Sequence, residues 1–114
     1  KGDMHTDHYE TALCSMVALR PVSEKSIKKI YAYETLSETE WNIPSVDNAF
    51  IPNVWVDISD TIELKLDAMA RFETQVKDFP HPRSLKAIRS LSEYRGSTVC
   101  VNNAESFMLI RSIE

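Results

Sequence analysis

The sequence predicts a small α/β domain, and two observations support this prediction. Apolar residues recur at helical spacing in three segments, whereas three other segments are short and rich in β-branched and aromatic residues. These segments follow one another as helix, strand, loop, strand, helix, helix and strand. The chain has 114 residues, enough for one domain with a modest core, and we expect residues 1–114 to form a single domain.

The first expected element is a helix over about Asp7–Leu19. Its apolar residues recur at helical spacing: Tyr9, Ala12, Leu13, Met16 and Val17. Thr6 or Asp7 is the expected N-cap, because their side-chain oxygens accept hydrogen bonds from the first helical N–H groups. Pro21 should end the element, because the residue before a proline avoids helical backbone angles.

A strand and a long loop are expected next. Ile27–Tyr33 predicts a strand because of its aromatic and β-branched content. The loop from Glu34 to about Asn53 is too long for a simple connector, and loops of this length are often functional. Its aromatic residues Trp41 and Phe50, with the nearby Trp55, are expected to pack against the fold rather than to stack on a ligand.

Val54–Ile58 predicts a second strand, which leads into a second helix. Asp60 and Glu63 have the spacing of a capping box at the start of this helix. The apolar positions that follow trace one helical stripe, expected to be core: Ile62, Leu66, Met69, Phe72 and Val76.

Two prolines in Phe79–Pro82 should stop the second helix, since proline is excluded from a helix interior. A third helix should begin near Ser84, with these residues facing inward: Leu85, Ile88, Leu91 and Tyr94. Gly96 is placed to end this helix. The apolar segment Ala104–Ile113 should close the fold as a strand or a docked segment.

Composition excludes several classes of function. The net charge of −4 gives no electrostatic basis for binding nucleic acid, and no apolar run is long enough to span a bilayer. The start of the chain has no apolar signal-peptide core. Cys14 and Cys100 are too few for a disulfide framework, so we expect two buried thiols and a cytoplasmic protein.

The most chemically distinctive segment is Asp3–His8. It holds two of the three histidines, three positions apart, with carboxylates interleaved. Imidazole and carboxylate are preferred ligands of zinc and iron. The alternative interpretation is a polar N-terminal tail in which Asp7 merely caps the helix.

Short motifs occur in a fixed order along nearly the whole chain. They are His5-Thr6-Asp7-His8, Tyr33-Glu34, Phe50–Asn53, Val56–Ser59, Lys65–Ala68, Phe79–Ser84, Arg95-Gly96 and Ala104–Phe107. Together they resemble the C-terminal part of the PIG-L/LmbE family of zinc-dependent N-acetylglucosamine deacetylases. Each motif is common by chance, and the resemblance rests on their order. It implies a Rossmann-like α/β fold with few strands and about three helices, of which this chain is the C-terminal fragment.

The resemblance also implies roles for the first motif. His8 would be a zinc ligand, His5 would stabilise the oxyanion formed on the amide, and Asp7 would orient His5. Zinc lowers the pKa of bound water to roughly 7, which supplies hydroxide for amide hydrolysis. The His-Pro-Asp-Asp motif that supplies two ligands and the base in this family is absent here. We therefore expect the chain alone to bind zinc weakly or not at all and to be inactive.

Three further residues are expected at the substrate. His81 and Arg83 would form a wall of the sugar site, and Glu105 would line its pocket. The alternative for His81 and Arg83 is a proline-stiffened turn with a solvated arginine. The alternative for Glu105 is a helix cap or an ion pair with an arginine. The expected partners are an N-acetylated amino sugar and either a second copy or a complementary N-terminal half. The alternative function is a non-catalytic α/β domain used for binding or oligomerisation.

Overall fold

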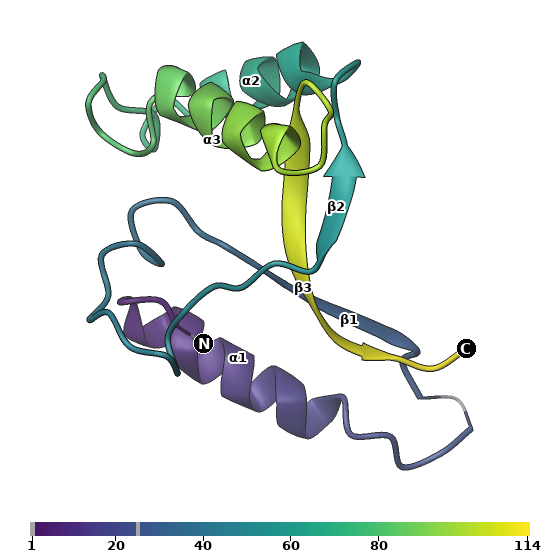
Figure 1. Ribbon diagram of the computed structural model, residues 1–114. Helices are drawn as coiled ribbons and strands as arrows, with labels where there is room; N and C mark the ends of the chain where they lie inside the picture. The colour runs from purple at the N-terminus through teal and green to yellow at the C-terminus, as the bar shows by residue number, and fades with distance from the viewer. Residues whose placement is uncertain (1, 25) are drawn as a thin grey trace. The chain divides into compact units, whose positions relative to one another are not determined.

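The computed structural model describes residues 2–24 and 26–114, and its helices and strands follow the predicted order (Figure 1). The described elements are α1 (Thr6–Ala18), β1 (Lys29–Tyr33), β2 (Val54–Asp57), α2 (Ile62–Ala70), α3 (Leu85–Ser97) and β3 (Ala104–Ser112). The strands form one sheet in the order β1-β3-β2. The predicted α/β class is confirmed at this level.

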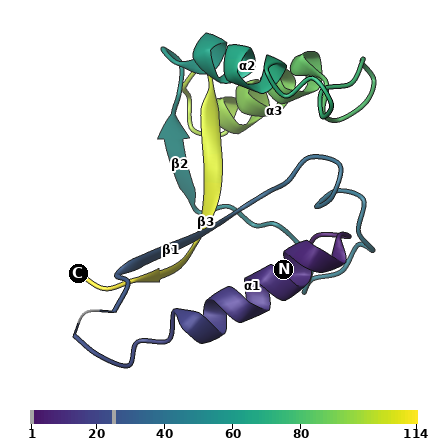
Figure 2. The ribbon, with the colours of Figure 1, turned by 180° about the vertical axis from the view of Figure 1, so that it is seen from behind.

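The chain divides into two compact units, a finer division than the single domain expected. One unit comprises Lys1–Asn53 with Phe107–Glu114, and the other comprises Val54–Ser106. The central strand β3 contributes residues to both. Figure 2 shows from behind that β3 lies between β1 and β2. We call these the split unit and the inserted unit, and each is described by itself.

The inserted unit holds the hydrophobic core of the described chain. Its buried apolar side chains are Ile62, Leu66, Ile88 and Ala104. They come from α2, α3 and the start of β3, and α2 packs against α3. The predicted start of the third helix is confirmed, because the Ser84 hydroxyl accepts a hydrogen bond from the Ala87 N–H at 3.1 Å.

Two predictions for α3 are wrong. Tyr94 is exposed, because the face that α3 buries carries Ile88, Ser92 and Gly96. Gly96 lies inside the helix rather than after its end. A Cβ on Gly96 would lie 2.6 Å from the Val101 carbonyl oxygen, so this glycine permits a close approach of the backbone.

The predicted boundaries of α2 are also wrong. Thr61 is the N-cap and makes no side-chain capping bond, so the Asp60–Glu63 capping box does not form. The helix ends at Ala70, and Phe72, expected in the core, is 62% exposed. Packing rather than propensity sustains most protein helices, and the stripe of α2 is fully covered only at Ile62 and Leu66.

In the split unit, β1 pairs antiparallel with the end of β3. The register runs from Lys29 opposite Ser112 to Tyr33 opposite Phe107, with an irregularity after Ile30. Asn53 extends the pairing on the other side of β3, where its N–H donates to the Phe107 carbonyl at 2.9 Å.

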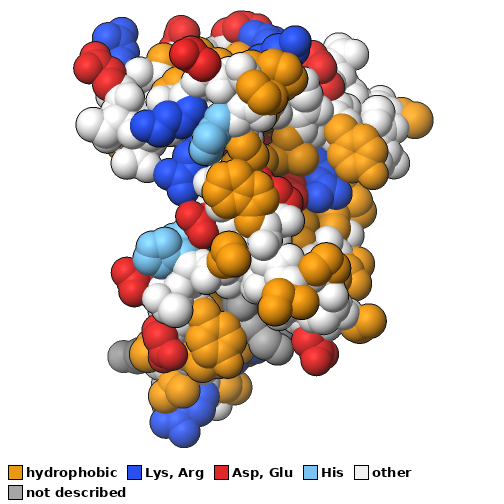
Figure 3. Space-filling model, turned by 90° about the vertical axis from the view of Figure 1, so that its left-hand side faces the viewer, with side chains coloured by type: hydrophobic (Ala, Val, Ile, Leu, Met, Phe, Trp, Pro, Cys, Tyr) orange, Lys and Arg blue, Asp and Glu red, His pale blue; other side chains and the backbone are white. Residues whose placement is uncertain are grey.

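Helix α1 buries none of its residues. Its larger apolar side chains are exposed: Tyr9, Leu13, Met16 and Val17. Hydrophobic side chains are also exposed among charged ones on the face drawn in Figure 3. Within the described part of the split unit, no hydrophobic side chain reaches full burial.

Exposure corrects three further predictions. Cys14 is exposed because α1 buries nothing, and Cys100 is exposed in a turn before β3 with a positive φ of 61°. Neither thiol is buried, and Cys100 is not in a strand. Trp41 is exposed, whereas Phe50 and Trp55 are partly buried as expected.

Among the described residues, no helix combines the length and the apolar character that crossing a bilayer requires.

Candidate functional site

His5 is the N-cap of α1, a position at which Thr6 or Asp7 was expected. Its backbone is extended, with φ −73° and ψ 122°, and its ring Nδ1 accepts a hydrogen bond from the Asp7 N–H at 3.2 Å. The ring nitrogen thus replaces the carboxylate or hydroxyl oxygen of a common N-cap. Because Nδ1 is the acceptor, the neutral ring carries its proton on Nε2.

Asp7 contacts His5 through its backbone rather than through its carboxylate. The Asp7 carboxylate oxygen lies 4.0 Å from His5 Nδ1, beyond hydrogen-bond length, and the side chain is 85% exposed. The backbone N–H of Asp7 already occupies the nitrogen that a carboxylate would need to meet. His5 is therefore oriented by the first turn of the helix itself.

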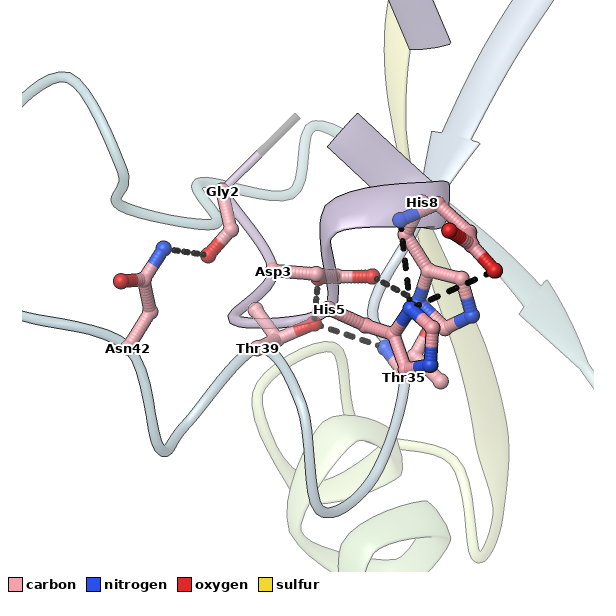
Figure 4. Close-up of polar contacts among 8 residues, drawn as sticks. Gly2, Asp3, His5, His8, Thr35, Thr39 and Asn42 are labelled. Carbon is pink, nitrogen blue, oxygen red and sulfur yellow. Dashed lines mark hydrogen bonds and ion pairs between the residues drawn. The ribbon is translucent and has the colours of Figure 1, made fainter. Parts of the chain in front are cut away.

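His8 is oriented by a carboxylate, that of Asp3. His8 Nδ1 lies 3.0 Å from Asp3 Oδ2, and the other oxygen of Asp3 accepts a hydrogen bond from the Thr39 hydroxyl at 2.5 Å (Figure 4). Thr39 Oγ1 in turn accepts from the Thr35 N–H at 2.8 Å. The Asp3 side chain is only 11% exposed, whereas His8 is 40% exposed. An ionised carboxylate only accepts, so His8 Nδ1 carries the proton.

The two rings stack on one another at the start of α1. Their centroids lie 5.0 Å apart with an angle of 24° between the planes. The two hydrogen bonds leave Nε2 with opposite properties in the neutral rings: His5 Nε2 carries a proton, and His8 Nε2 carries a lone pair. The pair can therefore supply one hydrogen-bond donor and one metal ligand.

The described residues contribute a partial metal site at most. Among residues 2–24 and 26–114, no three side chains of His, Cys, Asp or Glu gather in a way that could hold a metal ion. His8 nevertheless fits the pattern of a zinc ligand, because zinc-binding histidines usually donate their other ring N–H to a carboxylate or carbonyl.

The other predicted site residues belong to the inserted unit. His81 Nδ1 accepts from the Arg83 N–H at 3.0 Å, and the Arg83 guanidinium donates to the Gln75 side-chain oxygen at 2.8 Å. Glu105 forms an ion pair with Lys65 of α2. The structure thus brings His81 and Arg83 together in one turn and gives Glu105 a separate partner, a lysine rather than an arginine.

Asp3 and Thr39 were missed by the sequence interpretation. Asp3 was noted only as one of the interleaved acids, and Thr39 lies 36 positions from it. No local spacing connects a loop threonine to an aspartate so far away. The only available signal was the length of the loop from Glu34 to Asn53, which suggested a function without naming a residue.

Comparison with known proteins adds no basis for assigning a function beyond this geometry and the sequence. No family model, no curated protein and no solved structure matches the chain. Any assignment of function therefore depends on the ordered motifs of the sequence and on the arrangement of His5, His8 and Asp3.

Proposed function

We propose that this chain is the C-terminal part of a zinc-dependent deacetylase that hydrolyses the amide of an N-acetylglucosamine-type sugar. His8 is the proposed zinc ligand and His5 the proposed oxyanion-stabilising residue. The single observation that carries the proposal is the stacked pair at the start of α1, in which Asp3 holds His8.

His8 contributes a ligand atom whose direction is fixed. Asp3 occupies Nδ1, so Nε2 projects its lone pair from a ring that is still 40% exposed. A bound zinc ion would supply a Lewis acid and a water that ionises near neutral pH. The remaining ligands and the general base would come from a His-Pro-Asp-Asp motif in a complementary N-terminal half, following the resemblance.

His5 contributes a hydrogen-bond donor beside that ligand. Its Nε2–H is free of the capping bond, which uses Nδ1. A donor aimed at the oxygen on which charge develops lowers the barrier to amide hydrolysis. Asp7 is the proposed residue that orients His5, through the backbone N–H that donates to Nδ1 and with its carboxylate 4.0 Å from the same nitrogen.

His81, Arg83 and Glu105 are the proposed sugar-binding residues. His81 and Arg83 share one turn, and the guanidinium suits hydroxyl or phosphate groups of a sugar conjugate. Glu105 would bind a hydroxyl from its ion pair with Lys65. We also propose a cytoplasmic location, which is consistent with two exposed free thiols, Cys14 and Cys100.

A second candidate function is a non-catalytic binding or oligomerisation domain. The exposed apolar side chains of α1 favour it, because exposed apolar surface commonly marks a protein interface. Under this alternative His5 acts only as the N-cap of α1.

The test separates the cap from the chemistry. The full-length protein encoded by the gene is assayed for zinc content and for deacetylation of N-acetylglucosamine conjugates. We expect His8→Ala to lose zinc, and His5→Asn to keep both zinc and the helix cap while kcat falls by about 10²–10³. Activity that neither substitution reduces would contradict the roles of His5 and His8. A full-length protein without deacetylase activity would contradict the deacetylase and favour the binding domain.

A further inference from the structure

We propose that the loop segment 35–42 positions His8. The positioning residues are Thr39, which belongs to this segment, and Asp3, which Thr39 contacts. The inference rests on the proposed function only in treating His8 as a ligand; the contacts themselves hold whatever His8 binds. The segment lies within the long loop between β1 and β2.

The loop forms hydrogen bonds with three consecutive residues that precede the two histidines: Gly2, Asp3 and Met4. Asn42 Nδ2 donates to the Gly2 carbonyl at 2.9 Å, the Thr39 hydroxyl donates to Asp3, and the Met4 N–H donates to the Glu38 carbonyl at 3.2 Å. Figure 4 shows the contacts of Gly2 and Asp3 with this loop. These bonds fix the chain immediately before His5 and His8.

The loop is itself ordered by internal bonds. The Thr39 N–H donates to the Thr35 carbonyl at 2.9 Å, which closes a helical turn. Ser37 is fully buried, has a positive φ of 68°, and donates its N–H to the Glu40 carboxylate at 2.5 Å. A positive φ at a residue other than glycine is uncommon and persists where neighbouring contacts impose it.

Gly2 provides a second, independent sign of close fit. A Cβ at Gly2 would lie 2.3 Å from the Asn48 carbonyl oxygen, closer than real Cβ contacts come. The segment before α1 and the loop therefore approach one another as two backbones. This approach places the Asp3 carboxylate between Thr39 and His8.

The hydrogen bonds of this network converge on the Asp3 carboxylate. The Thr35 N–H donates to Thr39 Oγ1, the Thr39 O–H donates to Asp3, and the His8 N–H donates to Asp3. The Thr35 N–H can only donate, which leaves the Thr39 hydroxyl proton for Asp3. With its other oxygen, Asp3 selects the His8 tautomer that leaves Nε2 free.

The test reads the tautomer directly and needs no enzyme activity. The chain is labelled with ¹⁵N-histidine, and long-range ¹H–¹⁵N spectra are recorded near pH ~8, where imidazole is neutral. We expect His8 to be protonated at Nδ1 in the unmodified chain. Asp3→Ala should shift the His8 tautomer population towards Nε2–H, and Thr39→Val should cause a smaller shift in the same direction. Thr39→Ser keeps the hydroxyl and should leave the population as in the unmodified chain.

Glu10→Ala is the matched control, an exposed acid on the same helix, and should leave the His8 spectrum unchanged. If Asp3→Ala fails to fold, the Thr39→Val and Thr39→Ser pair decides the matter. An unmodified chain with His8 protonated at Nε2, or identical spectra for the two Thr39 variants, would overturn the proposal.

A metal titration of the full-length protein separates this proposal from the proposed function. Loss of the Asp3 carboxylate should weaken zinc affinity by about 10–100-fold if His8 is a ligand. A changed tautomer with unchanged zinc affinity would support the positioning role of the loop and contradict the assignment of His8 as a zinc ligand.

Discussion

At Gly96, neighbouring backbone atoms determine how replacement of the glycine by alanine changes stability. An alanine in a helix interior is ordinarily more stable than glycine by about 1 kcal/mol. Here the added Cβ would meet the Val101 carbonyl oxygen at 2.6 Å and the Asn103 nitrogen at 2.9 Å, both of them backbone atoms. The steric cost should therefore exceed the gain in helix propensity.

We expect Gly96→Ala to lower the free energy of unfolding by about 1–3 kcal/mol, as overpacking of a tight site does. Urea unfolding followed by circular dichroism measures the change. Ser90→Ala, at an exposed position of the same helix, should stay within about 0.5 kcal/mol of the unmodified chain. A more stable Gly96→Ala chain would refute the steric argument.

Asp57 carries a pH dependence whose sign can be worked out. Hydrogen bonds from the Ser59 hydroxyl and then from the Ser59 N–H hold the pKa of the Asp57 carboxyl below its ordinary value of 3.8. A carboxyl group whose pKa is lower in the folded chain stabilises that chain above its unfolded pKa. This stabilisation is lost as the pH falls through the folded pKa.

Asp57→Asn keeps an oxygen acceptor for Ser59 and does not titrate. We expect the difference in urea midpoint between the two chains to be constant above pH ~5 and to shrink below about pH 4. A difference that stays constant down to acid unfolding would contradict the assigned cause.

Individual residues differ in how far the sequence could predict them. Ser84 was predictable as an N-cap because its partner, Ala87, lies three residues away. His5 and His8 were recognised by their residue type. Asp3 was assigned no function, because the hydroxyl that fixes it comes from Thr39, on a loop whose path the sequence does not indicate.

At the scale of the elements, α2 and α3 should supply most of the stability of the inserted unit. Leu66 is a buried residue of α2, which packs against α3. Truncation of a buried leucine to alanine typically costs about 2–5 kcal/mol. We expect a loss in this range for Leu66→Ala in urea unfolding. Ile88→Val, a milder change in the same core, should cost about 0.5–1.5 kcal/mol.

Leu64 gives the matched control on the same helix, since it is 70% exposed. Leu64→Ala should change the free energy of unfolding by less than about 0.5 kcal/mol. Equal losses at Leu64 and Leu66 would mean that α2 does not bury the face that the structure assigns to it.

The order of the elements was predictable because each carries its own periodicity, but their ends were not. Helix α2 was expected to continue past Phe72 because apolar residues continue at helical spacing. It ends at Ala70, since spacing indicates which residues share a face without showing how far a neighbour covers that face. The exposure of Cys14 has the same cause on α1.

At the scale of the molecule, burial is unevenly distributed between the two units. The buried hydrophobic residues of the described chain lie in the inserted unit, whereas α1 exposes its apolar side chains. Surfaces of this kind favour association. We therefore propose that the chain forms dimers or binds a complementary chain through α1.

Size-exclusion chromatography with light scattering tests this association. Leu13→Lys and Met16→Lys should shift the chain towards monomer, because each places a charge among exposed apolar side chains of α1. Ile43→Lys, at an exposed position outside the helix, should not change the mass. A clean monomer for the unmodified chain would contradict the dimer and leave a complementary chain as the partner of α1.

The division of β3 between the units also sets an order of events during protein synthesis. The partners of β1 are residues 107–112 of β3, which leave the ribosome long after β1 itself. Because the inserted unit is continuous in sequence, α2 and α3 can pack before residues 107–112 of β3 are available to pair with β1. Nascent chains stalled through a C-terminal linker long enough to place residues 1–106 outside the exit tunnel should therefore contain a folded inserted unit and an unpaired β1.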